Sequence, residues 1–212
     1  MITLGIELSS RQGSVALLKD GALLAEKKWL GERVRHNILF QTLETLLCEA
    51  GVSYSDISLY AVGRGPGSFS GMRMSFAVAQ ALALPNKTEV RAVSSGAALA
   101  LAAAREGAKR IAVVGDARRG QFWVGLFQCL EDGALKVSNP WKLVPYEDLV
   151  VPEGTLIVGP EAERLTQYFP DIGNARFPLA SDVAALALIQ GNSEPLEPLY
   201  MHPPVFIEPK FG

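Results

Sequence analysis

The stretch Gly63-Arg64-Gly65-Pro66-Gly67-Ser68-Phe69-Ser70-Gly71-Met72-Arg73 decides how this chain is organised. An apolar run, Leu59–Val62, leads into it, and a pattern of small and apolar residues typical of a helix, Ser75–Leu84, follows it. Glycines at close spacing and a proline indicate a compact turn. The stretch therefore predicts a sharp connection from a buried strand into a helix.

This turn can bind an anion, because a helix start presents free backbone N–H groups. Ser68 and Ser70 can cap the helix, and Arg73 is expected in its first turn. The candidate anion contacts in the turn are Gly65, Gly67, Ser68 and Arg73. The spacing matches no catalytic loop: a P-loop lysine is missing, the glycines are one residue too far apart for a dinucleotide fingerprint, and Phe69 stands where a nucleophile elbow has serine. A structural turn with incidental anion affinity is favoured.

The composition is typical of a well-buried globular protein. Of 212 residues, 49% are hydrophobic and 20% charged, and the formal net charge of −2 argues against a nucleic-acid binder that acts alone. No apolar run approaches the roughly twenty residues of a membrane span, and the first residues lack the pattern of a signal peptide. We therefore expect a cytoplasmic protein with no membrane contact. Two cysteines and two distant histidines, His36 and His202, predict no metal site.

Hydrophobic periodicity and turn residues predict an alternation of strands and helices. In the first half we expect strands at Ile2–Leu8, Ser14–Lys19, Ala22–Leu30 and Thr88–Val93, and helices at Asn37–Ala50 and from Ser94-Ser95 to about Arg105. In the second half we expect a strand at Thr155–Val158 and helices at Glu161–Tyr168 and Asp182–Ile189, the last capped by Ser181. The proline-rich tail, Glu194–Gly212, is predicted to run over the surface with Tyr200, Val205 and Phe206 as anchors.

The pattern of the first strands occurs twice. Arg110–Gly120 repeats the order of Thr3–Gly13, namely an apolar strand, an acid and a glycine turn, and Asp132-Gly133-Ala134-Leu135 repeats Asp20-Gly21-Ala22-Leu23. Asp-Gly turns are common, so two unrelated hairpins are the alternative, but the matched order favours duplication. We predict two halves, an N-terminal one at 1–107 and a degenerate C-terminal one at 108–212.

Each repeat places one acid at the end of its first strand, Glu7 and Asp116. In duplicated folds of this layout that position faces a cleft, where a carboxylate can hold a metal–phosphate complex. The alternative is that each acid accepts hydrogen bonds from the turn after it. We favour the alternative for Glu7, because no glycine-rich phosphate loop with threonine or lysine follows it.

The first two helices are the candidate partner surface. Phe40 lies beside the apolar stripe of the Asn37–Ala50 helix, and the Ser75–Leu84 helix is apolar nearly all round, which indicates deep burial or an interface. Charged substitutions at Phe40 or Val78 are expected to abolish partner binding. The candidate interface residues are Arg35, His36, Leu39, Phe40, Leu43, Phe76, Val78 and Ala79. The basic residues Arg33, Arg35, His36, Arg118 and Arg119 could together contact RNA phosphate or a partner's acids.

Taken together, these residues resemble one family. Gly65–Arg73 is similar to the Gly-Pro-Gly-Ser-Phe-Thr-Gly-Leu-Arg signature of the bacterial TsaB (YeaZ) proteins. Further matches lie before two helices, after a repeated strand and near the end of the chain: Arg35-His36, Val93-Ser94-Ser95, Asp116–Gly120 and Pro198–Met201. The resemblance spans nearly the whole chain.

The resemblance implies an α/β fold of the duplicated ASKHA type (actin, sugar kinase and Hsp70), with two βββαβα halves of which the second is reduced. It implies a non-catalytic scaffold that binds and activates the paralogue TsaD. TsaD transfers a threonylcarbamoyl group to the adenosine 3′ of the anticodon in tRNAs that read codons beginning with A. It also implies pairing through the first helices, a TsaE-like ATPase as a further partner, and tRNA only within the complex. Whether the isolated chain forms a homodimer through the same helices is left open by the sequence, although an exposed apolar surface favours it.

The chain departs from the family pattern at its acids and at its adenosine motif. Glu7 stands where most relatives have Asp, Gly159-Pro160-Glu161-Ala162 replaces a Gly-Gly motif, and the metal-binding histidines of TsaD are absent. These departures imply a subunit without catalysis, metal or cofactor, with a nucleotide only at an interface of the complex. A small ASKHA-type ATPase or kinase, using Glu7, Asp116 and the glycine loop, is the alternative. A peptidase using Ser68 or Ser70 is a third reading.

Overall fold

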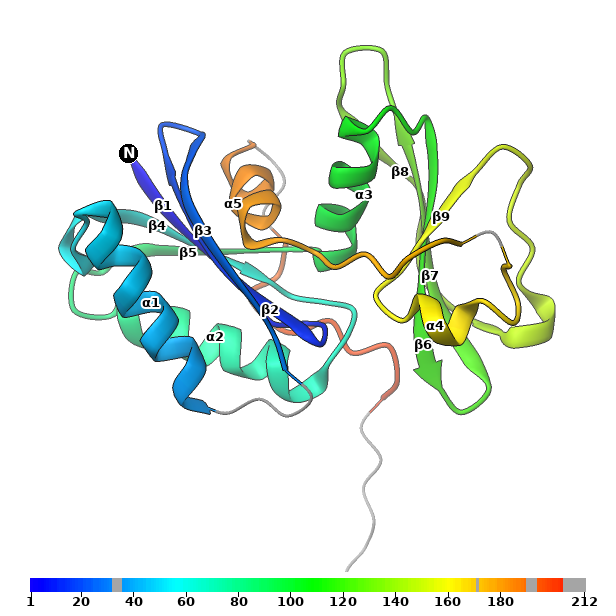
Figure 1. Ribbon diagram of the computed structural model, residues 1–212, viewed down its shortest axis with the longest axis horizontal. Coiled ribbons are helices and arrows are strands. Elements are labelled where there is room, and N and C mark those ends of the chain that lie inside the picture. Colours follow the sequence, from blue (N-terminus) through cyan, green and yellow to red (C-terminus); the bar gives the residue numbers. More distant parts are fainter. Residues whose placement is uncertain (32–35, 171, 190–193, 204–212) are drawn as a thin grey trace, which may run out of the picture.

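The computed structural model describes residues 1–31, 36–170, 172–189 and 194–203, and contains two β-sheets with helices on their faces (Figure 1). Among the sequence predictions, those for Arg33, Arg35, Val205 and Phe206 lie outside the described residues, as does the side chain of His36. In the described part, no helix is both long enough and apolar enough to cross a membrane.

The first sheet has the strand order β3-β2-β1-β4-β5. Its strands are β1 (Ile2–Glu7), β2 (Gln12–Lys19), β3 (Ala22–Leu30), β4 (Ile57–Gly63) and β5 (Glu89–Val93). The first three are antiparallel, whereas β4 runs parallel to β1 and β5 parallel to β4. Asp20 and Gly21 both have positive φ and turn β2 into β3, as the Asp-Gly pair predicted.

The second sheet, with the order β8-β7-β6-β9, has the topology of the first without an equivalent of β5 among the described residues. Its strands are β6 (Arg110–Arg118), β7 (Gln121–Cys129), β8 (Leu135–Pro145) and β9 (Leu156–Val158). Strands β6, β7 and β8 are antiparallel neighbours, and β9 runs parallel to β6. The predicted duplication is confirmed, and the second copy is the reduced one.

The helices link the two halves. Helices α1 (His36–Ala50) and α2 (Phe69–Ala83) cover one face of the first sheet, and α5 (Ala180–Leu188) covers the other (Figure 1). Helix α3 (Ser95–Arg105) packs on both the second sheet and α5. The expected boundary at 107/108 separates the two sheets, but α5 returns from the second half of the sequence to the first sheet. The division into two domains remains a proposal.

The centre of the first sheet is buried on both faces, so every residue of β1 after Ile2 is buried, including Thr3 and Glu7. One face packs Leu4, Ile6 and Leu17 against α1 and α2, and the other packs Ala16, Leu59 and Ala61 against α5. Small side chains on the α5 side let the helix approach closely. At Gly5, for example, an added Cβ would overlap the carbonyl oxygen of Ala180.

Several predicted helix boundaries were wrong. Helix α2 begins at Phe69, not near Ser75, so Arg73 is its fifth residue and not in its first turn. Helix α5 begins at Ala180 after Leu179, so Ser181 is not its cap; the Ser181 N–H instead donates to Glu26 Oε1 at 3.2 Å. Helix α4 covers only Ala162–Leu165. The remaining segments are two short 3-10 helices, Tyr54–Asp56 and Tyr146–Asp148.

Candidate functional site

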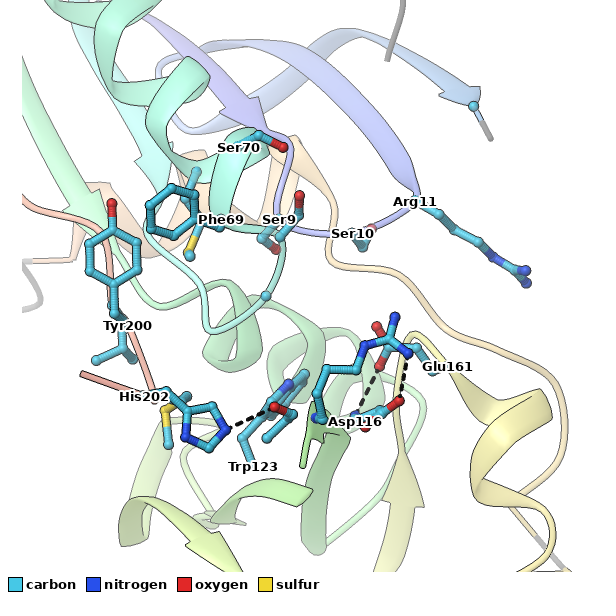
Figure 2. Close-up of a pocket in the computed structure, with 18 residues that line it drawn as sticks. Ser9, Ser10, Arg11, Phe69, Ser70, Asp116, Trp123, Glu161, Tyr200 and His202 are labelled. Atoms are coloured by element: carbon cyan, nitrogen blue, oxygen red, sulfur yellow. Dashed lines mark hydrogen bonds and ion pairs between the residues drawn. The ribbon is translucent and has the colours of Figure 1, made fainter. Parts of the chain in front are cut away.

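A cleft with a volume of about 920 Å³ lies between the two halves (Figure 2). The first half contributes the β1–β2 turn and the start of α2, the second half contributes the ends of β6 and β9, and the C-terminal segment closes one side. The residues that line the cleft include Ser9, Arg11, Ser68, Phe69, Ser70, Asp116, Arg118, Trp123, Glu161, Tyr200 and His202.

The glycine loop packs against the end of β1. A Cβ added at Gly67 or Gly71 would overlap a carbonyl oxygen of the β1–β2 turn, so both positions require glycine. Backbone N–H groups of the loop already have acceptors: Gly65 N donates to Ser95 Oγ at 2.9 Å and Ser68 N donates to Ser9 O at 2.6 Å. These two N–H groups are not available to an anion, so the structural reading of the turn is the better one.

Ser68 is the N-cap of α2, as predicted, and its Oγ accepts from Gly71 N at 3.3 Å. Ser70 lies one residue inside the helix and is exposed. No hydrogen bond joins either serine to His202 in the described structure; His202 Nε2 is bonded to Ala117 O at 2.9 Å. The geometry therefore does not assemble a serine nucleophile with a base.

Glu7 is fully buried and does not line the cleft. Its Oε1 accepts from Ser9 N, whereas Oε2 has no hydrogen-bond partner among the described residues. Burial raises the pKa of this carboxyl, and hydrogen bonding from Ser9 only partly opposes the rise. The prediction that Glu7 bonds the turn after it is confirmed, and its candidate contact with a nucleotide is contradicted by this burial.

Asp116 does line the cleft, but donors surround its carboxylate. Oδ1 accepts from Tyr146 OH and from Arg118 N, both at 2.8 Å. Oδ2 pairs with Arg164 Nη1 at 2.9 Å and Arg118 Nη1 at 3.2 Å. The hydrogen bond to Asp116 raises the pKa of Tyr146 to about 12. This acid is already neutralised by two guanidinium groups.

Glu161 is a cleft residue that sequence reasoning did not identify. Its Oε2 accepts from Asp116 N at 3.3 Å (Figure 2). Burial raises the pKa of Glu161 to about 7; the Asp116 N–H opposes the rise and the Asp116 carboxylate adds to it. The sequence feature that could have identified Glu161 is its position shortly after β9, the strand that corresponds to β4 in the first half.

The C-terminal segment holds the two halves together. Arg64, which is buried, pairs with Glu194 Oε2 at 3.0 Å and donates to Glu197 O at 2.9 Å. Farther along, Tyr200 stacks on Phe69 with ring centroids 4.9 Å apart, and His202 bonds the second half. The prediction of Tyr200 as an anchor is confirmed. We call residues 194–203 the strap.

Arg73 does not point into the glycine loop. Its guanidinium carbon lies 4.2 Å from the centre of the Phe69 ring, and its Nε donates to Tyr200 OH at 2.8 Å. Arg73 therefore does not form one site with the N–H groups of the loop, and its anion contact stays a prediction. The arginine belongs to an aromatic cluster at the mouth of the cleft.

The β6–β7 turn adds two arginines with unusual backbone conformations. Arg118 and Arg119 have φ of 64° and 54°, and both side chains are exposed. A left-handed conformation costs a residue with a Cβ about 1–2 kcal/mol. Arg118 ends β6 at a register shift, and Arg119-Gly120 is the two-residue turn to β7, where asparagine or glycine would suit the position of Arg119 better.

Most predicted interface side chains lie in the chain's own core. Leu39, Leu43 and Ala79 are fully buried, and Phe76 and Val78 nearly so, because α1 and α2 direct them onto the first sheet. They offer no contact area in this conformation, which corrects their prediction as contact residues. Phe40 differs, with 49% of its surface exposed on α1.

Comparison with known proteins gives a family match. The family model described as TsaD, tRNA N6-adenosine threonylcarbamoyltransferase, matches residues 32–137, half of the chain. The tRNA threonylcarbamoyladenosine biosynthesis protein TsaB of Escherichia coli (strain K12) is 35% identical over 134 residues, 63% of this chain and 58% of that protein. The chain thus spans less than two thirds of that relative's length.

Solved structures match over nearly the whole chain. YeaZ from Pseudomonas aeruginosa has a TM-score of 0.79 at 30% identity and covers 94% of this chain and 99% of its own. An uncharacterized protein described as similar to peptidase YeaZ from Pseudomonas aeruginosa has a TM-score of 0.80 at 30% identity, with 95% and 99% coverage. These likenesses confirm the predicted α/β fold, and the two sheets of matching topology confirm its duplication. With the sequence matches, they show that the chain belongs to the TsaB (YeaZ) family.

Proposed function

We propose that the chain is a non-catalytic subunit that binds and activates a TsaD-like transferase. The reaction is transfer of a threonylcarbamoyl group to the adenosine 3′ of the anticodon in tRNAs that read codons beginning with A. The name of the Escherichia coli relative and the TsaD family model support this pathway. A TsaE-like ATPase as a further partner, tRNA bound only in the complex, and a homodimer in isolation belong to the same proposal.

The observation that carries the non-catalytic role is the state of the two repeat acids. An ASKHA-type ATPase needs a carboxylate that faces the metal and phosphates of its nucleotide. Here Glu7 is buried outside the cleft, and the carboxylate of Asp116 is occupied by Tyr146, Arg118 and Arg164. Neither carboxylate is free to hold a metal–phosphate complex.

The face proposed to bind the transferase is formed by α1 and α2. These helices lie on the face of the first sheet opposite α5, and the start of α2 reaches the cleft (Figure 1). Exposed aromatic side chains surrounded by smaller groups are frequent anchors of protein interfaces. Phe40 is such a side chain, and Gln41, Glu44 and Thr45 are exposed beside it.

The test is reconstitution with the transferase paralogue. Phe40→Asp should abolish co-elution with the transferase and reduce tRNA modification to the level without this chain, because it places a charge at the proposed contact. Val150→Asp is the matched control, since Val150 is also exposed but lies in the second half. Val78→Asp, by contrast, is expected to unfold the chain, because Val78 is buried.

Wild-type-like co-elution of Phe40→Asp would contradict the proposed face. Modification that is equally fast with and without the wild-type chain would contradict activation. Calorimetric titration with Mg-ATP addresses the ATPase or kinase alternative: submicromolar binding with turnover would overturn the non-catalytic role. Specific peptide cleavage lost on Ser68→Ala or Ser70→Ala would instead favour a peptidase.

A further inference from the structure

The mouth of the cleft carries an exposed aromatic pair held by an arginine. Phe69 is 53% exposed and Tyr200 37%, and Arg73 contacts both rings. Both rings lie outside the hydrophobic clusters of the core, and each keeps surface exposed although the stack anchors the strap. A pair of exposed rings beside a guanidinium group is suited to stacking a nucleobase.

The same mouth carries more positive than negative charge. Five arginines lie in or beside it, against the acids Asp116, Glu161 and Glu163. Arg11 and Arg118 line the cleft, Arg164 lines the neighbouring pocket, Arg73 contacts Phe69, and Arg119 follows Arg118 in the chain; among these arginines the pairing differs. Three of them pair with acids, Arg11 with Glu163, and Arg118 and Arg164 with Asp116. Arg73 and Arg119 form no ion pair within the described ranges of the chain. Arg73 contacts the stacking surface, and Arg119 is next in the chain to Arg118, which lines the same cleft. Cations placed in this way are complementary to a sugar–phosphate strand.

The conformation of the β6–β7 turn is the second observation. Arg118 and Arg119 keep exposed cationic side chains at two positions where the backbone favours glycine or asparagine. Strain of this kind often accompanies functional sites. A requirement for cationic side chains at the mouth would explain why arginines occupy these two positions.

We propose that this mouth, formed by Phe69, Tyr200, Arg73 and the Arg118–Arg119 turn, contacts a single-stranded segment of the tRNA. One base stacks on the aromatic pair, and the neighbouring phosphates meet the arginines. The inference rests on the proposed function, since the net charge of −2 argues against RNA binding by the isolated chain. Helix α2 begins at the mouth and continues along the face proposed for the transferase, so RNA held there can reach both proteins.

The chain offers a matched pair of substitutions to test the charge. Arg119→Gly removes one cation and relieves a left-handed residue at the mouth. Lys87→Gly does the same at an exposed turn after the opposite end of α2, where φ is 53°. Both variants should have an unchanged or higher melting temperature and should bind the transferase normally. Only Arg119→Gly should weaken tRNA binding by the complex.

The readout is fluorescence anisotropy of labelled tRNA with the reconstituted complex at several salt concentrations. Arg119→Gly should raise Kd about three- to tenfold and lower the slope of log K against log salt by about 0.7, the value for one phosphate of a single strand. Arg119→Lys should restore both. Phe69→Leu keeps an apolar side chain without a ring, and should raise Kd about tenfold with the slope unchanged.

The outcomes separate this inference from the proposed function. If the wild-type chain does not co-elute with the transferase, the proposed function and this inference fail together. If co-elution is normal but Arg119→Gly and Phe69→Leu bind tRNA like the wild type, only this inference is overturned. If Arg119→Gly loses the transferase rather than the tRNA, the mouth contacts acidic groups of a protein, and the RNA assignment is overturned too.

Discussion

Two carboxyl groups at equivalent places in the repeat have opposite surroundings. Glu7 lies beneath Gly63 and Ser95 with one oxygen lacking a hydrogen bond among the described residues, whereas Asp116 is surrounded by donors. Burial disfavours the charged form of Glu7 and raises its pKa, whereas the carboxylate of Asp116 is paired with two arginines. The difference comes from what the next elements place around each acid.

Glu7→Gln should stabilise the chain increasingly as pH rises. Because burial raises the folded pKa of Glu7 above the unfolded value of about 4.3, the wild type loses stability as pH rises from that value through the folded pKa. Glutamine keeps the acceptor for Ser9 N and has no charge to bury. Thermal melts at pH 4.5 and pH 8 measure the effect. An equal difference in melting temperature at both pH values would contradict the explanation.

The glycine loop lies in close contact with the β1–β2 turn and leads directly into helix α2. Strand β4 must end, and α2 must begin, directly against the backbone of the β1–β2 turn, which leaves no room for side chains. The loop therefore sets the position of α2, and with it Phe69 and Arg73. Its glycines allow this close packing, and the exposed side chains, Phe69 and Arg73, lie on the helix that follows.

Gly71→Ala tests this packing. Its Cβ would overlap the carbonyl oxygen of Leu8, so we expect the free energy of unfolding to fall by about 1–3 kcal/mol. Gly107→Ala is the comparison: φ there is 100° with open space around it, and only conformational strain of about 1 kcal/mol applies. Urea denaturation of both variants provides the measurement. A smaller loss for Gly71→Ala than for Gly107→Ala would contradict close packing as the reason for the glycine.

Across the whole molecule, the two halves are joined by exchanged helices, by ion pairs and by the strap. Arg105 pairs with Asp182 between α3 and α5, and Arg11 pairs with Glu163 across the cleft. The strap adds Tyr200 and His202, one contacting each half. These contacts hold the cleft at one width.

Glu194→Ala should detach the strap. It leaves the buried Arg64 guanidinium without its carboxylate, which we expect to cost about 1–3 kcal/mol because Glu194 is itself partly exposed. Limited proteolysis should cut residues 194–203 before the rest of the chain unfolds. Glu197→Ala is the control, since Glu197 contacts Arg64 through its backbone carbonyl alone. Equal protease resistance of the two variants would argue against the strap's dependence on this pair.

The strands, the duplication and the family could be predicted because they depend on local patterns. Apolar strands, Asp-Gly turns and the Gly65–Arg73 stretch are each readable within a few residues of sequence. Interface residues could not be predicted in the same way, as Leu39 and Val78 show. An apolar side chain gives the same sequence pattern whether it faces the chain's own sheet or a partner. Glu161 shows the limit for sites, because its raised pKa depends on the burial created by segments from both halves.

The order of strands, acids and glycines along this chain is enough to specify a duplicated α/β fold and its TsaB (YeaZ) family. The fold follows from backbone geometry and hydrophobic periodicity, which act between near neighbours, and the family follows from the resemblance of Gly65–Arg73 to its signature. Tertiary contacts alone decide which N–H groups of the glycine loop are already bonded and which side chains lie beside the loop. Ser95 and Ser9 take up two of its N–H groups, and the strap brings Tyr200 onto Phe69 at the start of α2. Those partners come from distant parts of the chain, and packing alone brings them to the loop.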